Sequence, residues 1–447
     1  METKKIVVVG GVAGGMSAAA KAKRTDKSLE ITVFERSAHV SYGACGLPYV
    51  ISGEVKSLDD LVSRTPEDMA EQGIAVRVRH EVTDVDPAAK TVSVKNLETG
   101  ETFTEPYDVL VLATGASATK PPLPGAELRG VHVLRNLEDG AAVLQTIRDG
   151  AKEAVIIGGS YIGLELAEAL VTAGLNVRVV EQAPALLPTF GPSAAEAALG
   201  VLGENGVEAH LDAEVTALEG DERVQKVVTS AGEFPADLVM IAVGAQPNSA
   251  LAAGLGLKLG PSDTVLTDER LRTSLEGVYA VGDLTATQHI VSGEPVWIPL
   301  GDTANKQGRV LGKILGGGDD RFKGIAGTAV TKVFDRAFAT TGLTLKAAQD
   351  AGFDAESKEI EATDHADYYP DHRPLSVTLV WERPSGRLLG AQLVGYGDAV
   401  KRVDVISALL FQKGTLQDLA DLDLAYAPPF SNAWDPLLVA ANVALGR

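Results

Sequence analysis

The chain has 447 residues, of which 45% are hydrophobic and 22% charged, as is typical of a globular protein with several domains. Its formal net charge of −20 disfavours nucleic acid and anionic membrane surfaces as partners, because like charges repel. It contains one cysteine, which excludes an intrachain disulfide and CxxC-type zinc sites and fits a reducing compartment. No apolar run is continuous enough for a membrane helix. We therefore expect a cytoplasmic protein with no membrane, nucleic-acid or metal partner.

The first predicted element is a buried strand over 5–9, which leads into a glycine-rich turn and a helix. A dinucleotide-binding turn needs glycine for a tight bend, for approach of a pyrophosphate and for packing of the helix on the strand. Gly10 and Gly15 fill the outer roles, whereas Val12 departs from the usual pattern in the middle one. Glu35 ends the next strand, where a carboxylate accepts ribose hydroxyls. The expected contacts of the first nucleotide are Gly10, Val12, Ala13, Gly14, Gly15, Glu35 and Arg36.

The same succession of strand, glycine turn, helix and acidic strand end recurs from residue 154. Two such repeats imply two nucleotides. The charge of Glu181, at the second strand end, would accept ribose hydroxyls and repel a 2′-phosphate, so we expect NADH to be preferred over NADPH. The expected contacts of the second nucleotide are Gly158, Gly159, Tyr161, Ile162, Gly163, Glu181 and Gly244.

Further strands are predicted between and after the two turns. Residues 74–78 and 91–94 alternate in hydrophobicity, as half-buried strands do. The apolar strand over 107–115 runs back toward the first nucleotide and ends in Ala113-Thr114-Gly115. A later apolar strand ends in Gly282-Asp283, where the carboxylate either caps a helix or contacts a cofactor.

The single cysteine, Cys45, lies in the segment Ser41-Tyr42-Gly43-Ala44-Cys45-Gly46-Leu47-Pro48-Tyr49, ten residues after Glu35. A lone cysteine is by default a small, inert, buried side chain. Here the preceding turn and strand place the thiol beside the first nucleotide, so we interpret Cys45 as the reactive group. Ser41 either hydrogen-bonds a sulfur atom or caps a helix.

Together these motifs resemble the FAD-dependent pyridine nucleotide-disulfide oxidoreductases over essentially the whole chain. The resemblance implies an α/β fold of two tandem Rossmann-like domains, for FAD and NAD(P)H, followed by a C-terminal α+β dimerisation domain. The implied boundaries are 1–115 with 250–322 for FAD, 116–249 for NAD(P)H and 326–447 for dimerisation. The resemblance also places Asp283 on the ribitol of FAD. The other implied FAD contacts are Ala113, Thr114, Gly115 and Gly282.

The cysteine count narrows the resemblance to one branch. Relatives that reduce glutathione, lipoamide or thioredoxin use two cysteines, which this chain lacks. The Cys45 segment resembles the single-cysteine branch, which contains coenzyme A disulfide reductases, NADH-dependent persulfide or polysulfide reductases, and NADH oxidases or peroxidases that cycle through a cysteine sulfenic acid. Oxidases and peroxidases typically carry a histidine in the first glycine turn, where this chain has Ala13. That difference favours a coenzyme A disulfide reductase or a persulfide reductase.

By this resemblance the protein is expected to reduce coenzyme A disulfide with NAD(P)H through a mixed disulfide between Cys45 and coenzyme A. Tyr368, Tyr369 and Tyr426 would reach across a homodimer and protonate the departing thiolate; without the resemblance they are amphipathic packing residues. The phosphates of coenzyme A need local positive charge on so acidic a protein, unless the basic residues only form a solvated helix face. The main candidates follow the first turn and are Lys21, Lys23, Arg24 and Lys27, and the weaker ones are Arg64 and the pair Lys401-Arg402.

Overall fold

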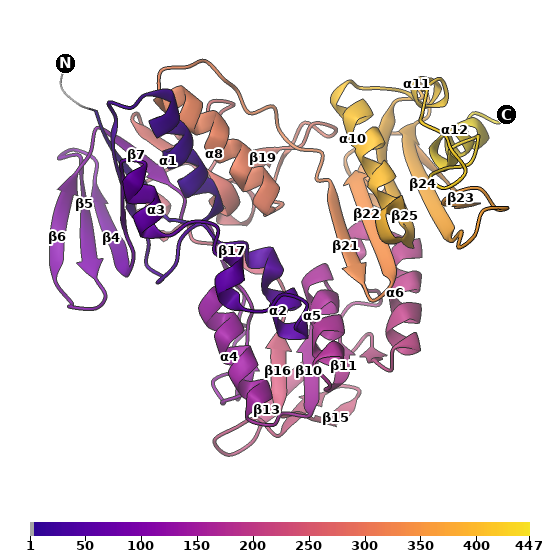
Figure 1. Ribbon diagram of the computed structural model, residues 1–447, viewed down its shortest axis with the longest axis horizontal. Helices are drawn as coiled ribbons and strands as arrows, with labels where there is room; N and C mark the ends of the chain where they lie inside the picture. The colour runs from indigo at the N-terminus through magenta and orange to yellow at the C-terminus, as the bar shows by residue number, and fades with distance from the viewer. Residues whose placement is uncertain (1–3) are drawn as a thin grey trace.

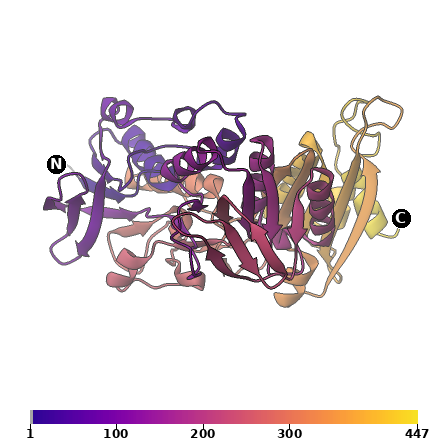
Figure 2. The ribbon, with the colours of Figure 1, turned by 90° about the horizontal axis from the view of Figure 1, so that it is seen from below.

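The structure is a computed structural model that describes residues 4–447, arranged in three parts (Figures 1 and 2). Two parts each contain a five-stranded parallel sheet, and the third contains a five-stranded antiparallel sheet. The predicted fold class, two Rossmann-like domains and a C-terminal α+β domain, is confirmed. The domain boundaries stay predictions, and residues 1–3 of the expected FAD domain lie outside the described residues.

The first sheet has the strand order β18-β7-β1-β2-β3, so a strand from late in the chain joins four early ones. The central strand β1 consists of Lys5–Val9, whose four β-branched residues after the lysine are buried and suit a strand covered on both faces. Its neighbours are β2 (Glu30–Phe34), β3 (Ile74–Arg77), β7 (Val109–Leu112) and β18 (Val278–Ala280). The associated helices are α1 (Ala13–Thr25), α3 (Pro66–Glu71) and α8 (Gly301–Leu315), and a small antiparallel sheet contains β4 (His80–Asp86), β5 (Thr91–Asn96) and β6 (Thr102–Pro106).

The second sheet repeats this plan with the order β12-β11-β10-β16-β9. Helix α4 begins with a capping box, in which Asn136 and Asp139 each accept a backbone N–H of the other. The strands are β9 (Val131–His132), β10 (Glu153–Ile157), β11 (Asn176–Val180), β12 (Glu208–His210) and β16 (Leu238–Ile241). The helices are α4 (Leu137–Arg148), α5 (Tyr161–Thr172) and α6 (Pro192–Glu204), and the antiparallel strands are β13 (Val215–Glu219), β14 (Lys226–Thr229) and β15 (Gly232–Pro235).

A short antiparallel ribbon marks where the chain passes from the first part to the second and back. It pairs β8 (Ala116–Ala118) with β17 (Ala245–Pro247). The smaller elements that follow are α7 (Ala250–Gly254), β19 (Thr287–Gln288) and β20 (Pro295–Val296). The two sheets are therefore joined by a double crossing, next to the strand ends that carry the predicted nucleotide contacts.

The third part is an antiparallel sheet in the order β21-β22-β25-β24-β23, with helices packed against it. Its strands are β21 (Ala329–Val333), β22 (Arg336–Gly342), β23 (Ala355–Thr363), β24 (Pro374–Glu382) and β25 (Leu388–Tyr396). Its helices are α9 (Leu345–Asp350), α10 (Val403–Phe411), α11 (Leu416–Ala420) and α12 (Pro436–Ala444). Figure 1 shows β21 nearest the middle of the molecule and β23 at the outer edge.

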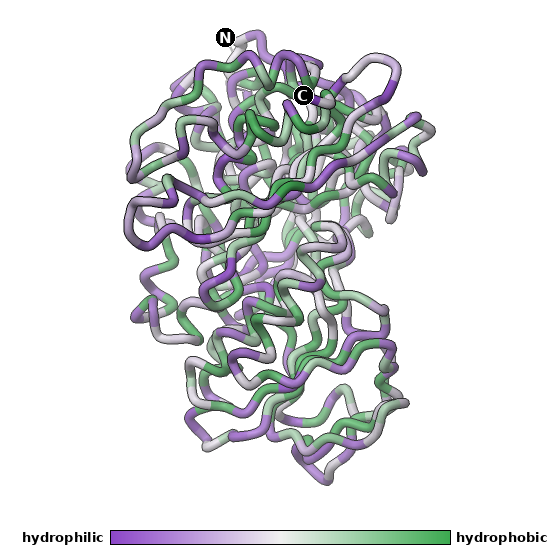
Figure 3. Tube along the Cα trace, turned by 90° about the vertical axis from the view of Figure 1, so that its right-hand side faces the viewer, coloured by the Kyte–Doolittle hydropathy of each residue, from purple (hydrophilic) through white to green (hydrophobic). Residues whose placement is uncertain are grey.

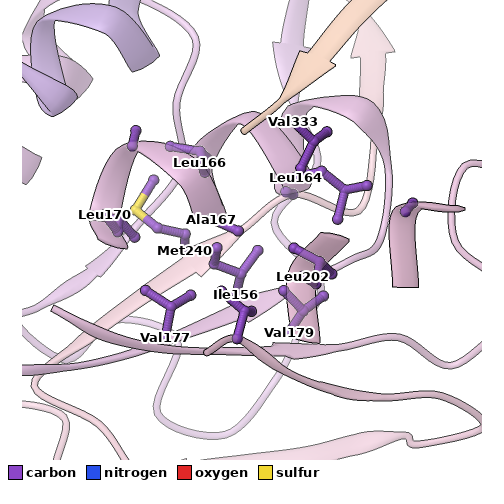
Figure 4. Close-up of a cluster of buried hydrophobic side chains, with 14 of the residues drawn as sticks. Ile156, Leu164, Leu166, Ala167, Leu170, Val177, Val179, Leu202, Met240 and Val333 are labelled. Atoms are coloured by element: carbon purple, nitrogen blue, oxygen red, sulfur yellow. The ribbon is translucent and has the colours of Figure 1, made fainter. Parts of the chain in front are cut away.

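The hydrophobic cores lie within and between these parts. Hydrophilic segments follow much of the outer loops, whereas hydrophobic segments run through the interior (Figure 3). In one cluster Leu164 and Ala167 of α5 lie over Ile156 of β10, and Val333 of β21 belongs to the same cluster (Figure 4). Since a fully buried aliphatic side chain contributes about 1.5–3 kcal/mol, this shared cluster fixes the third part on the helix of the second.

Within 4–447, no helix combines the length and the apolar character that a membrane crossing requires. In the same residues, no three histidine, cysteine or acidic side chains are grouped so that they could hold a metal ion.

Candidate active site

The first glycine turn joins β1 to α1 under tight steric limits. Gly10 has a φ of +107°, and a Cβ there would lie 2.1 Å from the carbonyl oxygen of Ala113. A Cβ on Gly15 would lie 2.0 Å from the carbonyl oxygen of Gly10. Val12 is the N-cap of α1 and makes no side-chain capping bond. The N–H groups of the first helical turn thus have no capping side chain, which suits an anion such as a pyrophosphate.

Glu35 is held in a fixed orientation beside this turn. Its carboxylate is buried and accepts the backbone N–H of Gly11 at 2.7 Å and that of Ser37 at 2.8 Å. Each carboxylate oxygen has a further lone pair, so the group can still accept hydroxyls. Ala13 is the first residue of α1, and Arg36 is exposed next to Glu35. These positions fit the predicted FAD contacts, whose roles stay predictions.

The second glycine turn repeats the geometry of the first. Gly158 has a φ of +113°, and a Cβ there would lie 2.6 Å from the carbonyl oxygen of Ala242. A Cβ on Gly163 would lie 2.1 Å from the carbonyl oxygen of Gly158. Here the helix is capped by a side chain, because Ser160 Oγ accepts the N–H of Gly163 at 3.4 Å. A hydrogen bond of this length is weak, so the start of α5 is capped only slightly more than the start of α1.

Glu181 occupies the place that Glu35 has in the first repeat. It accepts the N–H of Gly159 at 2.6 Å and that of Ala183 at 2.7 Å. Tyr161 and Ile162 begin α5, and Gly244 has a φ of +112° just after β16. The predicted contacts of the second nucleotide therefore lie together at the carboxyl ends of three neighbouring strands, β11, β10 and β16, where parallel sheets bind ligands.

The loop that carries Cys45 is attached to the first glycine turn. Cys45 lies in a short 3₁₀ helix, Ala44–Gly46, directly before helix α2 (Leu47–Ser52). The N–H of Ser41 donates to the carbonyl oxygen of Gly11 at 3.0 Å, and the N–H of Gly43 donates to that of Leu61 at 2.9 Å. Both sides of the loop are thus anchored, which places the thiol near the first glycine turn, and its position beside a nucleotide stays a prediction.

Ser41 itself adopts an unusual conformation. Its φ is +50°, in the left-handed region that a serine seldom occupies. It caps neither of the helices that follow, since their N-caps are Gly43 and Gly46. The capping alternative for Ser41 is therefore wrong, and a contact of its hydroxyl with sulfur stays a prediction.

Charged groups from three other segments influence the Cys45 thiol, which is exposed in the single chain. Desolvation by the neighbouring protein atoms raises the pKa of the thiol, and the carboxylate of Glu165 raises it further. The guanidinium of Arg135 lowers this pKa, whereas the carboxylate of Asp283 raises it. The protein atoms alone therefore favour the protonated thiol. Additional positive charge near the sulfur, or neutralisation of the nearby carboxylates, would be needed to favour the thiolate.

Helix α5 carries Tyr161 and Glu165, and the charge of Glu165 influences both Tyr161 and Cys45. Burial raises the pKa of Tyr161, and the charges of Glu165 and Cys45 add to that effect. Burial also raises the pKa of Glu165, whose Oε1 accepts a hydrogen bond from Thr331 Oγ1 at 2.8 Å. Burial raises the pKa of Tyr42 to about 12. These phenols thus remain protonated hydrogen-bond donors at neutral pH.

Asp283 lies where the first turn, the second part and the late strand β18 meet. It forms an ion pair with Arg135, whose Nε donates to the carbonyl oxygen of Ala116 at 3.1 Å. Trp297 Nε1 donates to the carbonyl oxygen of Asp283 at 2.8 Å. A Cβ on Gly14 would lie 3.5 Å from the Cα of Gly282. The structure thus brings the Gly282-Asp283 pair to the start of α1.

The strand end Ala113-Thr114-Gly115 is tied to the return crossing. Thr114 Oγ1 donates to the carbonyl oxygen of Asn248 at 2.8 Å, and Asn248 Nδ2 donates to that of Thr114 at 2.8 Å. This reciprocal pair fixes the crossing beside the predicted FAD contacts.

The predicted tyrosines lie away from Cys45 within one chain. Tyr368 and Tyr369 follow β23, which is the sheet edge opposite β21, and β21 is the strand that contacts α5. Four strand spacings separate β23 from β21, or about 19 Å. Tyr368 and Tyr426 are exposed, and their hydroxyl oxygens are 3.4 Å apart. The structure joins these two tyrosines to each other but not to the thiol of the same chain.

The predicted basic residues differ in their surroundings. Lys23 and Arg24 lie in the last turn of α1, the end remote from the glycine turn, and Lys23 Nζ donates to the carbonyl oxygen of Leu29 at 2.6 Å. Arg24 and Arg64 are exposed. Arg402 is largely buried and donates to groups of its own domain, so it is not free to bind a phosphate. A role of Lys23, Arg24 and Arg64 in coenzyme A binding stays a prediction.

Sequence reasoning missed Arg135 and Glu165. Arg135 directly precedes the cap of α4 and has no motif that marks it. Glu165 follows Tyr161 by four residues, and this helical spacing could have placed it on the same face. Both become neighbours of Cys45 only through tertiary packing.

The chain belongs to the pyridine nucleotide-disulphide oxidoreductase family. Residues 4–308 match the family described by that name, and residues 328–437 match its dimerisation domain. The predicted family is therefore confirmed, and the third part of the fold is the family's dimerisation domain.

Several curated relatives align over nearly the full length. The NAD(P)H coenzyme A polysulfide/persulfide reductase of Pyrococcus horikoshii is 39% identical over 442 residues, 98% of each chain. The NADH oxidase of Methanocaldococcus jannaschii is 34% identical over 446 residues, 99% of each chain. The coenzyme A disulfide reductase of Staphylococcus aureus is 32% identical over 435 residues, 96% of this chain and 97% of the relative.

A solved structure is also very similar. The structure of reduced Bacillus anthracis CoADR-RHD superposes with a TM-score of 0.97 at 37% identity, and the match covers 100% of this chain and 81% of the other. Relatives that are named for different activities thus share this fold, so the fold alone does not determine the reaction.

Proposed function

We propose that this protein is a flavoprotein that uses NAD(P)H, with NADH preferred, to reduce coenzyme A disulfide to two molecules of coenzyme A. The observation that carries the proposal is Cys45, the only cysteine, in a loop attached to the first glycine turn. A single thiol cannot store electrons as an internal disulfide. It either pairs with a sulfur atom of the substrate or cycles through a sulfenic acid, and the names of two relatives support pairing with a sulfur atom that comes from coenzyme A.

The residues at the two turns fit the cofactors of this reaction. FAD suits the first turn, where Glu35 has free lone pairs and Asp283 lies at the start of α1. NADH suits the second, where Glu181 would accept ribose hydroxyls and repel a 2′-phosphate. Bound together, the two cofactors supply a hydride from NADH and deliver its electron pair to sulfur through the flavin.

The chemistry of Cys45 consists of two exchanges. The Cys45 thiolate attacks one sulfur of coenzyme A disulfide, which forms the mixed disulfide and expels one coenzyme A thiolate. The electron pair then breaks the mixed disulfide, releases the second coenzyme A thiolate and restores the Cys45 thiolate. Each departing thiolate takes up one proton. One of these two protons comes from the hydride of NADH and the other from solution, so one NADH and one proton are consumed. A free thiol with this role fits a location in the reducing cytoplasm.

A second copy of the chain would complete the site. Tyr368 and Tyr426 lie at the sheet edge remote from the Cys45 of their own chain, on the matched dimerisation domain. They can reach a thiol only in a partner chain, where Tyr426, Tyr368 or Tyr369 would protonate the departing thiolate. The exposed side chains of Phe430 and Trp434 lie in the same region and support an interface there.

A second candidate is reduction of coenzyme A persulfide or of polysulfides, which the name of the Pyrococcus relative supports. The Cys45 thiolate would attack the outer sulfur, expel coenzyme A or the shortened polysulfide as a thiolate and form a Cys45 persulfide. The electron pair from NADH would then break this persulfide and release hydrosulfide, so this candidate uses the same residues. An NADH oxidase is disfavoured because Ala13 stands where oxidases typically have histidine.

Anaerobic oxidation of NADH with coenzyme A disulfide tests the proposal. The wild type is expected to release two thiols per NADH and the Cys45→Ser variant none, although its flavin is still reduced by NADH. Rapid oxygen-dependent turnover without disulfide, together with little thiol release, would overturn the proposal in favour of an oxidase.

A further inference from the structure

The two loops that carry the tyrosine pair come from separate regions of the sequence. The Tyr368 loop, residues 364–373, connects β23 to β24, and the Tyr426 loop, residues 421–435, connects α11 to α12. The hydroxyl oxygens are 3.4 Å apart although the side chains of Tyr368 and Tyr426 are 71% and 51% exposed. Exposed aromatic residues on loops need some other constraint to hold their separation.

Arg402 lies between these loops and binds both. Its Nη2 donates to the carbonyl oxygen of Asp364 in the Tyr368 loop at 2.8 Å and to that of Phe430 in the Tyr426 loop at 2.9 Å. Its Nε donates to Asp435 Oδ2 at 2.9 Å, and its Nη1 donates to the carbonyl oxygen of Ala399 at 3.3 Å. One planar guanidinium thus fixes the relative position of the two loops.

The guanidinium is itself held by a buried carboxylate. Asp435 is 7% exposed, and its Oδ1 accepts the N–H of Leu437 at the start of α12 at 2.9 Å. Its Oδ2 also accepts the hydroxyl of Ser431 at 2.9 Å. The side chain of Arg402 is 15% exposed, so solvent screens these charge-assisted bonds little. The orientation of Arg402 is therefore set by α12 and not by a ligand.

We propose that Arg402 is a positioning residue for disulfide reduction, which it serves by holding Tyr368 and Tyr426 in the arrangement that protonates the departing coenzyme A thiolate. This inference rests on the proposed function. Two other contacts also join these regions: the N–H of Ala366 donates to the carbonyl oxygen of Pro428 at 3.3 Å, and Asn432 Nδ2 donates to the carbonyl oxygen of Thr363, at the end of β23, at 3.0 Å. Without Arg402, the carbonyls of Asp364 and Phe430 would lose their common donor, and only the remaining bonds would hold the two loops together.

A double-mutant cycle in the FAD-loaded enzyme tests the role. The variants are Arg402→Gln, the pair Tyr368→Phe/Tyr426→Phe, and their combination, with Arg383→Gln as the matched control. Arg383 is an exposed arginine of the same domain that pairs only with Asp354 among acidic side chains of the described residues. Arg402→Gln and the tyrosine variant should each lower kcat for thiol release by about tenfold or more. The combination should be no more than about twofold slower than the slower parent.

Flavin reduction by NADH provides the internal control, because it does not involve the tyrosines. It should keep its rate in all variants, and Arg383→Gln should match the wild type throughout. Arg402→Lys retains the charge but not the planar guanidinium that binds two carbonyls, so it should have an intermediate kcat. This variant replaces Arg402→Gln in the experiment if Arg402→Gln does not fold. Losses that multiply in the combination, or an equal loss in flavin reduction, would overturn the positioning role.

Hydrogen exchange tests the same inference without turnover. In Arg402→Gln, amides of both loops should exchange at least about tenfold faster, whereas those of β24 and β25 should be unchanged. Exchange that is unchanged in the loops, or faster throughout the domain, would contradict the inference. A wild type that releases no thiol would contradict the proposed function, and the exchange result would still decide whether Arg402 holds the loops together.

Discussion

The glycine turns of the two parallel sheets have nearly the same geometry. Gly10 and Gly158 have φ values of +107° and +113°, and each would place a Cβ against a carbonyl oxygen of the neighbouring strand. Glu35 and Glu181 each accept two backbone N–H groups, at 2.7 and 2.8 Å in the first repeat and at 2.6 and 2.7 Å in the second. These shared constraints define a place for a nucleotide and do not distinguish one nucleotide from the other.

The helices after the turns differ in what they contact. Helix α1 packs on α8, where a Cβ on Gly308 would lie 2.4 Å from the carbonyl oxygen of Gly14 and one on Gly312 would lie 2.5 Å from that of Ala18. Helix α5 instead contacts α2 and β21 and carries Glu165, whose charge adds to the desolvation that raises the pKa of Cys45. The first repeat thus holds the reactive loop, and the second supplies charged and phenolic groups around it. The difference between the sites lies in these neighbours.

The largest effect is expected from Gly10→Ala, which should remove FAD and all activity. The added Cβ would lie 2.1 Å from a backbone oxygen, which cannot move without displacing β7. Flavin absorbance of the purified protein measures the result. Gly100→Ala is the control, since Gly100 has a φ of +78° but open space around it, and it should keep FAD. A Gly10→Ala protein with normal FAD content would contradict the assignment of the first turn.

Gly158→Ala should separate the two repeats. Its Cβ would meet the carbonyl oxygen of Ala242 at 2.6 Å, so the second turn is distorted while the first is not. We expect normal FAD content and a KM for NADH raised by about tenfold or more, as for loss of substrate binding. Steady-state kinetics with saturating disulfide provide the measurement. Loss of FAD in this variant would show that the two sites are not independent.

Glu181→Gln should weaken NADH selectivity with a smaller effect. Replacement of the carboxylate removes one acceptor of ribose hydroxyls and the charge that repels a 2′-phosphate. The ratio of kcat/KM for NADH to that for NADPH should fall by several-fold, about 1 kcal/mol. Glu35→Gln, the equivalent change in the first repeat, should leave this ratio unchanged. An equal change in both variants would contradict the assignment of NADH to the second turn.

The smallest expected effect is a shift of the Cys45 titration. Besides desolvation, the charge of Glu165 raises the pKa of Cys45 and that of Arg135 lowers it. At pH values above the raised pKa of Glu165, its carboxylate is charged and disfavours the Cys45 thiolate. Glu165→Gln removes this charge and should move the pH profile of Cys45 alkylation to lower pH. Arg135→Gln should move it to higher pH. The rate of iodoacetamide labelling measures both, and shifts in the same direction would contradict this electrostatic account.

Local patterns predicted the elements that local chemistry determines. The β-branched run at residues 5–9 forms the predicted strand, and the glycines at both turns occupy the positions that require them. The single cysteine, together with its distance from Glu35, indicated the reactive loop. These features depend on residues close in sequence and on steric rules that hold in any fold.

Tertiary contacts account for what the sequence did not reveal. Residues 74–77 alternate in hydrophobicity, and this pattern alone did not show that they belong to the first parallel sheet. They form its edge strand, which is only partly covered and therefore alternates. Arg135 and Glu165 come near Cys45 from segments that carry no reactive motif. Arg402 was a candidate for binding phosphate, but the carbonyls that hold it lie 38 and 28 residues away along the chain.

The central claim is that Cys45 exchanges with coenzyme A through a mixed disulfide, and intact mass of the holoenzyme tests it most directly. The protein is first reduced and desalted, then mixed with coenzyme A disulfide without NADH. The wild type should gain one coenzyme A per chain, Cys45→Ser should gain none, and NADH should remove the adduct. A wild type that gains no coenzyme A, or that retains it after NADH is added, would contradict the account.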